Sequence, residues 1–159
     1  MTGMFIEEPA PTNEYLRIHV RANSNDTEEQ AVKYKVKDAV VEFLSPIIAE
    51  CTTKQKAQAL LTQNESEIKR VADKVLKQNG FNYQARVEVK QEIFPTRVYN
   101  GVELKSGVYD ALIIELGSGK GDKWWCVVYP PLCFTGEGTS YVYRSKILQI
   151  IHDFFDKEN

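Results

Sequence analysis

Two cysteines enclose the most unusual segment of this sequence. Cys126 and Cys133 are seven positions apart, and the segment 124–134 around them holds both tryptophans and the adjacent prolines Pro130 and Pro131. Seven extended steps span roughly 23 Å, whereas the Cα atoms of a disulfide lie about 4.4–6.8 Å apart. A disulfide is therefore possible only if the prolines turn the chain back. It also requires an oxidising compartment, where it would stabilise the fold by roughly 2.5 kcal/mol.

Two other uses of these thiols have less support. Cys126 and Cys133 lack the short Cys-x-x-Cys spacing of a zinc knuckle, and only His19 and His152 could complete the ligand set, so we predict no metal site. A Cys126 thiolate beside His19 would be a nucleophile, but the sequence contains no oxyanion motif or nucleophile turn. We favour buried thiols or a disulfide, with His19 on a strand surface or hydrogen-bonded. A cysteine-dependent hydrolase that uses Cys126 with a histidine is the alternative, and Cys51 is interpreted as a buried apolar residue.

Two polar segments invite a ligand-binding interpretation. The glycine-rich run 117–121 is not a Walker phosphate loop, because Ile114 and Gly121 occupy its first and last required positions, and we interpret it as a hairpin loop. The run 23–26 between a strand and a helix could present its amides to an anion, although capping by Asp26 explains it equally well. We therefore predict no cofactor.

Composition limits the partners. The chain has 159 residues, a formal charge of -2 and a pI near 5.8, which gives it no bulk attraction to nucleic acid or anionic lipid. Apolar runs such as 111–114 are far shorter than the ~18 residues that span a bilayer, so we predict no membrane span. The N-terminus has no secretory pattern, which favours either a cytosolic protein or a mature portion whose leader was removed.

The first half of the sequence predicts one strand and a helical segment. Residues 15–22 alternate apolar side chains with Arg17, His19 and Arg21, which predicts a half-buried strand. Helices follow over 26–79, with capping signals at Asp26, at the capping-box spacing of Thr52 with Gln55, and at Asn64 with Glu67, and a left-handed cap at Gly80. Pro46 should end or kink the first of these helices.

The second half predicts strands and a final helix. A strand with one wet face begins near Tyr83, Asn100-Gly101 predicts a tight hairpin, and 108–116 and 123–129 suit two central strands. Trp124 and Trp125 should point to opposite faces, and we favour core packing of both over a contact role for one. With a helix over 141–156, the pattern predicts one α+β domain over 15–157, with a mostly antiparallel sheet of four to six strands. Residues 1–14 are interpreted as a flexible arm or an expression remnant.

Several of these segments together resemble a known family. The matching features are the run 16–24, the spacing of Gln30, Lys33, Val36 and Asp38, the run 94–97, and the segment 124–134 with its tryptophans, prolines and cysteines. Across Tyr15 to Phe134 the order and spacing resemble stage II sporulation protein R. The sequence departs from the family at Asn25, where Asp is usual, and at Lys37, where Arg is usual.

The resemblance implies a non-enzymatic signalling protein of endospore formation. Such proteins are secreted from the forespore into the space between the two membranes, where they activate a membrane-embedded aspartic protease of the mother cell that processes the precursor of an early sigma factor. Secretion makes a Cys126–Cys133 disulfide reasonable and implies that a leader preceding Met1 was omitted. For partner contact we select His19, Asn23, Arg97 and Trp125, because they are polar or amphipathic residues on or beside apolar strands. The sequence predicts no oligomeric state.

Overall fold

The elements of the fold follow the predicted order. The computed structural model describes residues 12–99, 101–136 and 139–158. Its elements are η1 (Thr12–Glu14), β1 (Leu16–Arg21), α1 (Thr27–Ile48), α2 (Lys54–Gln63), α3 (Glu65–Gln78), β2 (Ala85–Phe94), β3 (Arg97–Tyr99), β4 (Val102–Leu104), β5 (Gly107–Leu116), β6 (Lys123–Tyr129), η2 (Leu132–Phe134) and α4 (Tyr141–Glu158). The α+β prediction is confirmed. No helix of the described residues is both long and apolar enough to span a bilayer.

The first strand lies inside the sheet. The main sheet has the order β2-β5-β1-β6, in which β1 runs parallel to β5 and the other two pairings are antiparallel. Strands β3 and β4 form a separate antiparallel hairpin. Because β1 separates β5 from β6, the glycine-rich run 117–121 is a crossover loop, and the predicted hairpin loop is wrong there. For the same reason β6 is an edge strand, not a central one.

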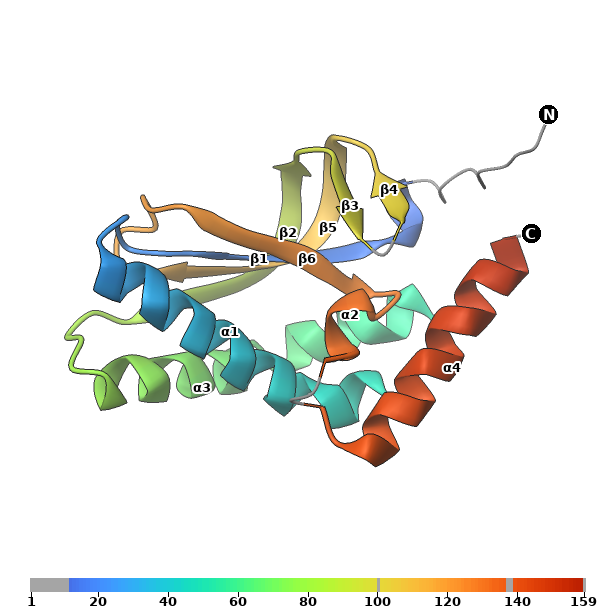
Figure 1. The fold of residues 1–159 in the computed structure, drawn as a ribbon, viewed down its shortest axis with the longest axis horizontal. Coiled ribbons are helices and arrows are strands. Elements are labelled where there is room, and N and C mark those ends of the chain that lie inside the picture. The colour runs from blue at the N-terminus through green and yellow to red at the C-terminus, as the bar shows by residue number, and fades with distance from the viewer. Residues whose placement is uncertain (1–11, 100, 137–138, 159) are drawn as a thin grey trace.

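One face of the sheet packs against the helices. Figure 1 shows α1, α2 and α3 on one side of the sheet and the β3–β4 hairpin on the other. Leu16, Ile18 and Val20 of β1 point toward the helices and are buried. The helices contribute apolar side chains that are also buried, among them Val36, Val40, Leu44, Leu61, Ile68 and Leu76. This face is the core that the apolar periodicity predicts.

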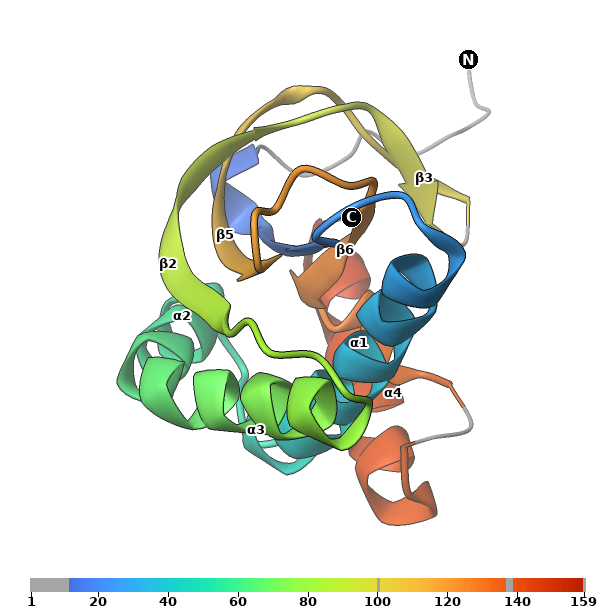
Figure 2. The same ribbon diagram turned by 90° about the vertical axis from the view of Figure 1, so that its left-hand side faces the viewer.

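The opposite face of β1 is also covered, so the predicted half-buried strand is wrong. Arg17 and His19 on that face are both 0% exposed. Figure 2 shows the reason: β2 and β5 arch over this face and lead to the β3–β4 hairpin. Along β2 the buried side changes accordingly, from Ala85 on the helix side to Phe94 under the arch, while Ile93 is 73% exposed. The single wet face predicted for this strand therefore holds only for its first part.

The helix caps are partly as predicted. The cap of α2 is Thr53, one residue after the predicted Thr52, and it accepts a hydrogen bond from the backbone N–H of Lys56 at 3.1 Å. Asp26 and Asn64 precede α1 and α3 as predicted, but neither side chain makes a capping hydrogen bond. The Asn64 amide donates instead to the carbonyl of Leu60, so the predicted capping box is wrong.

Three backbone predictions have different outcomes. Gly80 has φ +86°, and the N–H of Phe81 donates to the carbonyl of Leu76, which confirms the left-handed cap. Helix α1 continues past Pro46 to Ile48, because the proline removes only one N–H in the last turn. The predicted hairpin joins β3 and β4, with Gly101 at φ +82°, although Asn100 lies outside the described residues.

Candidate functional site

The two faces of β6 have different roles. Trp124 and Cys126 point toward the helices, whereas Trp125 points under the arch, which confirms that the tryptophans face opposite sides. Trp124 lies beside α1, where the Lys37 ammonium is 5.3 Å from its ring centroid. Both tryptophans are half-buried.

The cysteines at the end of β6 form a disulfide. Cys126 and Cys133 are bonded with their Cα atoms 6.1 Å apart, so the chain turns back through Pro130 and Pro131. The Cys133 sulfur also accepts a hydrogen bond from the N–H of Val127 at 2.9 Å. The disulfide therefore fastens η2 to the outer edge of β6.

This geometry does not form the hypothetical catalytic dyad. In the register of β1 and β6, Cys126 is opposite Ile18 and His19 is opposite Trp125. Cys126 and His19 consequently lie on opposite faces of the sheet. The Cys126 thiol is also consumed by the disulfide, so no thiolate is present to act as a nucleophile.

Loss of the disulfide should destabilise the fold measurably. Replacing Cys126 and Cys133 with serine is expected to lower the free energy of unfolding by about 2–3 kcal/mol, because the loop of the unfolded chain is no longer constrained. Urea denaturation with and without reductant measures this. The matched control is Cys51→Ala, which removes the buried free thiol and should leave the sensitivity to reductant intact. Equal stability of the wild-type protein in both conditions would contradict the prediction.

The covered face of the sheet holds an aromatic–cationic cluster, which we define as Arg17, His19, Phe94, Tyr99, Tyr109 and Trp125. The Arg17 guanidinium lies 4.5 Å from the Phe94 ring centroid and 4.6 Å from that of Tyr109. It also donates to the Tyr99 hydroxyl at 3.1 Å. Arg17 forms no ion pair among the described residues, so ring faces and a phenol stabilise its buried charge.

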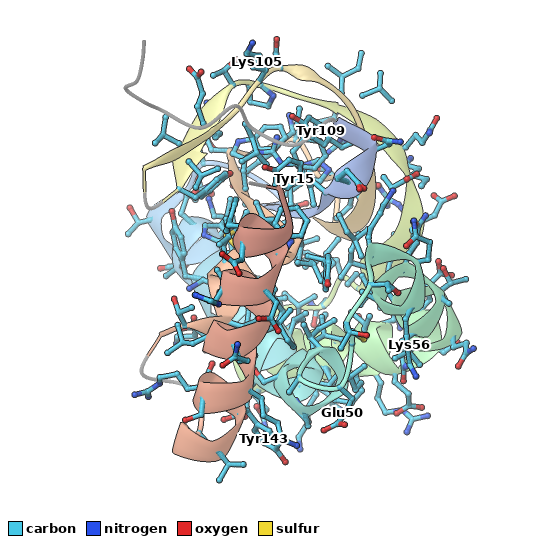
Figure 3. All side chains as sticks on the ribbon, turned by 90° about the vertical axis from the view of Figure 1, so that its right-hand side faces the viewer. Tyr15, Glu50, Lys56, Lys105, Tyr109 and Tyr143 are labelled. Carbon is cyan, nitrogen blue, oxygen red and sulfur yellow. A yellow bond between two sulfur atoms is a disulfide. The ribbon has the colours of Figure 1, made fainter. Side chains whose placement is uncertain are left out.

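Tyr109 connects the cluster to the arch. Its hydroxyl donates a short hydrogen bond to the carbonyl of Lys105, at the point where the hairpin returns to β5. Figure 3 shows Tyr109 and Lys105 at this end of the molecule and Glu50 and Lys56 at the opposite end. The cluster is thus held from β1, β5, β6 and the hairpin together.

His19 is buried in this cluster, and its predicted surface position is wrong. Its ring stacks on Trp125 with centroids 4.9 Å apart. Burial, reinforced by Arg21 and Lys123, lowers the pKa of His19 to about 3. The imidazole is therefore neutral at pH 7, and its 3.4 Å contact with Glu92 is not an ion pair there.

This histidine should make the fold sensitive to acid. The unfolded chain takes up a proton at His19 near pH 6.5, whereas the folded chain does so only near pH 3, so stability falls as pH drops through this range. Between pH 7 and 5 the expected loss from this residue is about 2 kcal/mol. Urea denaturation of wild-type protein and His19→Gln at both pH values isolates the contribution. If the free energy of unfolding changed equally between pH 7 and 5 in both proteins, the prediction would be contradicted.

Two cations lie at the rim of the cluster. The Arg97 guanidinium is 5.7 Å and the Lys123 ammonium 5.3 Å from the Trp125 ring centroid. Neither forms an ion pair with any described carboxylate, whereas their neighbour Arg21 is paired with both Glu92 and Glu115. The structure thus brings together Arg97 and Trp125, two of the predicted contact residues. Lys123 was not predicted, because nothing in the sequence places it near Arg97.

The remaining predicted contact residue, Asn23, has a different environment. Its amide donates to both carboxylate oxygens of Glu29, and its Oδ1 accepts from the N–H of Ser118 at 2.7 Å. Neighbouring Asn25 accepts from the N–H of Asp122 at 2.7 Å. These bonds attach the crossover loop to the start of α1. The aspartate that is usual at this position in the resembled family could accept the same bond, so asparagine at position 25 keeps this role.

Further hydrogen bonds to Glu29 complete this attachment. The carboxylate of Glu29 also accepts hydrogen bonds from the hydroxyls of Ser24 and Tyr83. Burial opposes ionisation of Glu29, but the hydrogen bonds outweigh it and lower its pKa. Gly121 closes the loop, because a Cβ there would lie 2.4 Å from the Ser24 carbonyl oxygen. The glycine-rich loop is therefore packed against the segment that follows β1 and does not form a phosphate-binding cradle.

Comparisons with known proteins place this chain in a family. A family model described as "Stage II sporulation protein R" matches residues 12–139. A curated relative of that name from Bacillus subtilis (strain 168) is 33% identical over 119 residues, which are 75% of this chain and 53% of the relative. The chain thus spans about half the length of that relative. No solved structure matches this chain. With the cysteine and tryptophan segment inside the matched region, the chain belongs to the stage II sporulation protein R family.

Proposed function

We propose that this chain is an extracytoplasmic signalling protein of endospore formation. In this proposal it is secreted from the forespore into the space between the two membranes. There it activates a membrane-embedded aspartic protease of the mother cell, which then processes the precursor of an early mother-cell sigma factor. Family membership supplies the sporulation context.

The Cys126–Cys133 disulfide is the observation that carries the proposal. Disulfides persist in oxidising compartments and are rare in the reducing cytosol of most bacteria. Here the bond fixes η2 against β6, so the compartment would decide whether this part of the fold is held. The same bond removes the thiol that the alternative hydrolase would need. Both consequences favour a binding protein that acts outside the cytoplasm.

Activation by such a ligand is a matter of differential affinity. A soluble protein can activate a membrane protease only by binding its active arrangement more tightly than its inactive one. Moving a two-state equilibrium from about 1:99 to 99:1 requires about 5.5 kcal/mol of such preference. An interface with a few well-packed aromatic and arginine contacts can supply that free energy.

The four selected residues divide into two roles in this proposal. Arg97 is exposed and Trp125 half-buried, so both can touch a partner. His19 supports the inner side of the Trp125 ring, and Asn23 holds the crossover loop, so we assign them positioning roles. Alanine at Arg97 should therefore reduce activation without a matching loss of stability, whereas alanine at Trp125 should reduce both, because its ring also packs on His19 and Phe94.

Reconstitution in a bacterium without the sporulation pathway tests the function. The host would produce the membrane protease, the sigma-factor precursor and this chain with an export leader, and precursor cleavage would be followed by immunoblot. Cleavage is expected with the exported chain. The control is the same chain without a leader, which should stay reduced and give no cleavage. No cleavage in the presence of exported, disulfide-bonded chain would overturn the proposal.

A further inference from the structure

The outer edge of β6 has unpaired backbone groups near Trp125. The N–H of Ala22 donates to the carbonyl of Asp122, and the N–H of Val127 points outward to the Cys133 sulfur. Bonded and non-bonded pairs alternate along an antiparallel ladder, so the backbone groups of Lys123 and Trp125 point outward as well. Among the described residues they have no hydrogen-bond partner. A short strand could pair with this edge.

The side chains beside this edge are cationic and aromatic. Arg97 and Lys123 both lie within the ~6 Å of the Trp125 ring at which cation–π attraction acts, and neither is neutralised by a described carboxylate. Burial is the main cause of the low pKa of His19, and Arg21, Lys123, Lys90 and Arg17 lower it further, which is consistent with several cations around this face. A ligand that brings carboxylates to this place would neutralise both cations.

We propose that an extended acidic segment of a partner protein pairs with the β6 edge at Lys123–Trp125, with carboxylates at Arg97 and Lys123 and an apolar side chain on Trp125. A peptide fits better than an anionic membrane or polymer, because the chain as a whole carries a charge of -2 and the excess cations gather around one ring. The free backbone groups also favour a peptide, since only a backbone offers complementary donors and acceptors. The inference deepens the proposed function by giving the chemistry of the contact, and it rests on that function only for the partner's identity.

A defined peptide tests this inference. The probe is acetyl-Glu-Thr-Val-Thr-Glu-amide, whose first, third and fifth side chains share the face of Lys123 and Trp125, titrated into the full chain while tryptophan fluorescence and backbone amide NMR signals are followed. We expect saturable binding with shifts centred on Lys123 and Trp125. Lys123→Glu and Arg97→Glu should each weaken binding about tenfold or more, whereas Lys56→Glu, at an exposed lysine of α2 on the opposite end of the molecule (Figure 3), should not.

Three further probes separate the inference from its rivals. A peptide with alternate backbone amides methylated should bind more weakly, because the edge needs those N–H groups. The inference is overturned if the peptide with lysine in place of glutamate binds equally, if Lys123→Glu and Arg97→Glu bind like wild type, or if only anionic vesicles bind. None of these measurements uses the protease, so their failure would leave the proposed function standing. Failed precursor cleavage by the wild-type chain would, in turn, leave the peptide site standing.

Discussion

Replacing Arg17 with alanine should destabilise the protein by about 3 kcal/mol and loosen the β3–β4 hairpin. The side chain is fully buried, and its guanidinium lies between the rings of Phe94 and Tyr109 while it bonds Tyr99. Alanine would leave a cavity among these rings, and large-to-small changes in a core cost about 2–5 kcal/mol. It would also remove the hydrogen bond that holds Tyr99, and with it the hairpin.

The matched variant for Arg17 is methionine. Methionine fills most of the same volume and avoids burying a charge, so Arg17→Met should cost about 2 kcal/mol less than Arg17→Ala. Urea denaturation gives both values, and hydrogen exchange of the β3–β4 amides reports the hairpin directly. Equal stability of Arg17→Ala and Arg17→Met would show that side-chain volume at position 17 does not stabilise the packing of these rings.

Removing the Asp110 carboxylate should have an effect of similar size. Lys54 is almost buried, and its ammonium contacts Asp110 at 2.5 Å and the carbonyl of Asn13 at 2.8 Å. Asp110→Ala would leave this ammonium without its counter-charge, and breaking such a pair costs about 3–5 kcal/mol. Since Asp110 retains some exposure, we expect about 3 kcal/mol. Thermal or urea unfolding measures the change.

The control for Asp110 replaces both charges. In the double variant Lys54→Met with Asp110→Leu, two apolar side chains take the place of the ion pair, which is often neutral for stability. We therefore expect the double variant to recover most of the stability lost in Asp110→Ala. A double variant as unstable as the single one would show that the shape of the pair, and not its charge, is what the fold requires.

The sequence predicted the elements better than their environments. Periodicity located β1, the three helices before β2, the hairpin and the opposite faces of Trp124 and Trp125, because these patterns are local. It predicted a wet second face for β1, since Arg17 and His19 are polar. The rings that cover Arg17 come from Phe94 and Tyr109, roughly eighty to ninety positions away, and no local pattern can place them there.

The candidate site shows the same limit. Arg97 and Trp125 could be selected from their residue types, and the structure places them together. Lys123 could not, because its position near Arg97 depends on the arch of β2 and β5 over the sheet. Asn23 looked like a contact residue because it is polar and ends a strand, yet its hydrogen bonds attach a loop.

The central position of β1 has a consequence for how the chain folds. Its partners are Asp110 to Glu115 on one side and Lys123 to Tyr129 on the other, more than ninety residues later in the sequence. Such distant pairings make a sheet slow to form. A chain that appears N-terminus first cannot complete the sheet until residue 129 is available. Until then most of its length stays flexible enough to pass through a translocation pore. Cys126 and Cys133 lie in the last part of the sheet to become available, so their disulfide forms late.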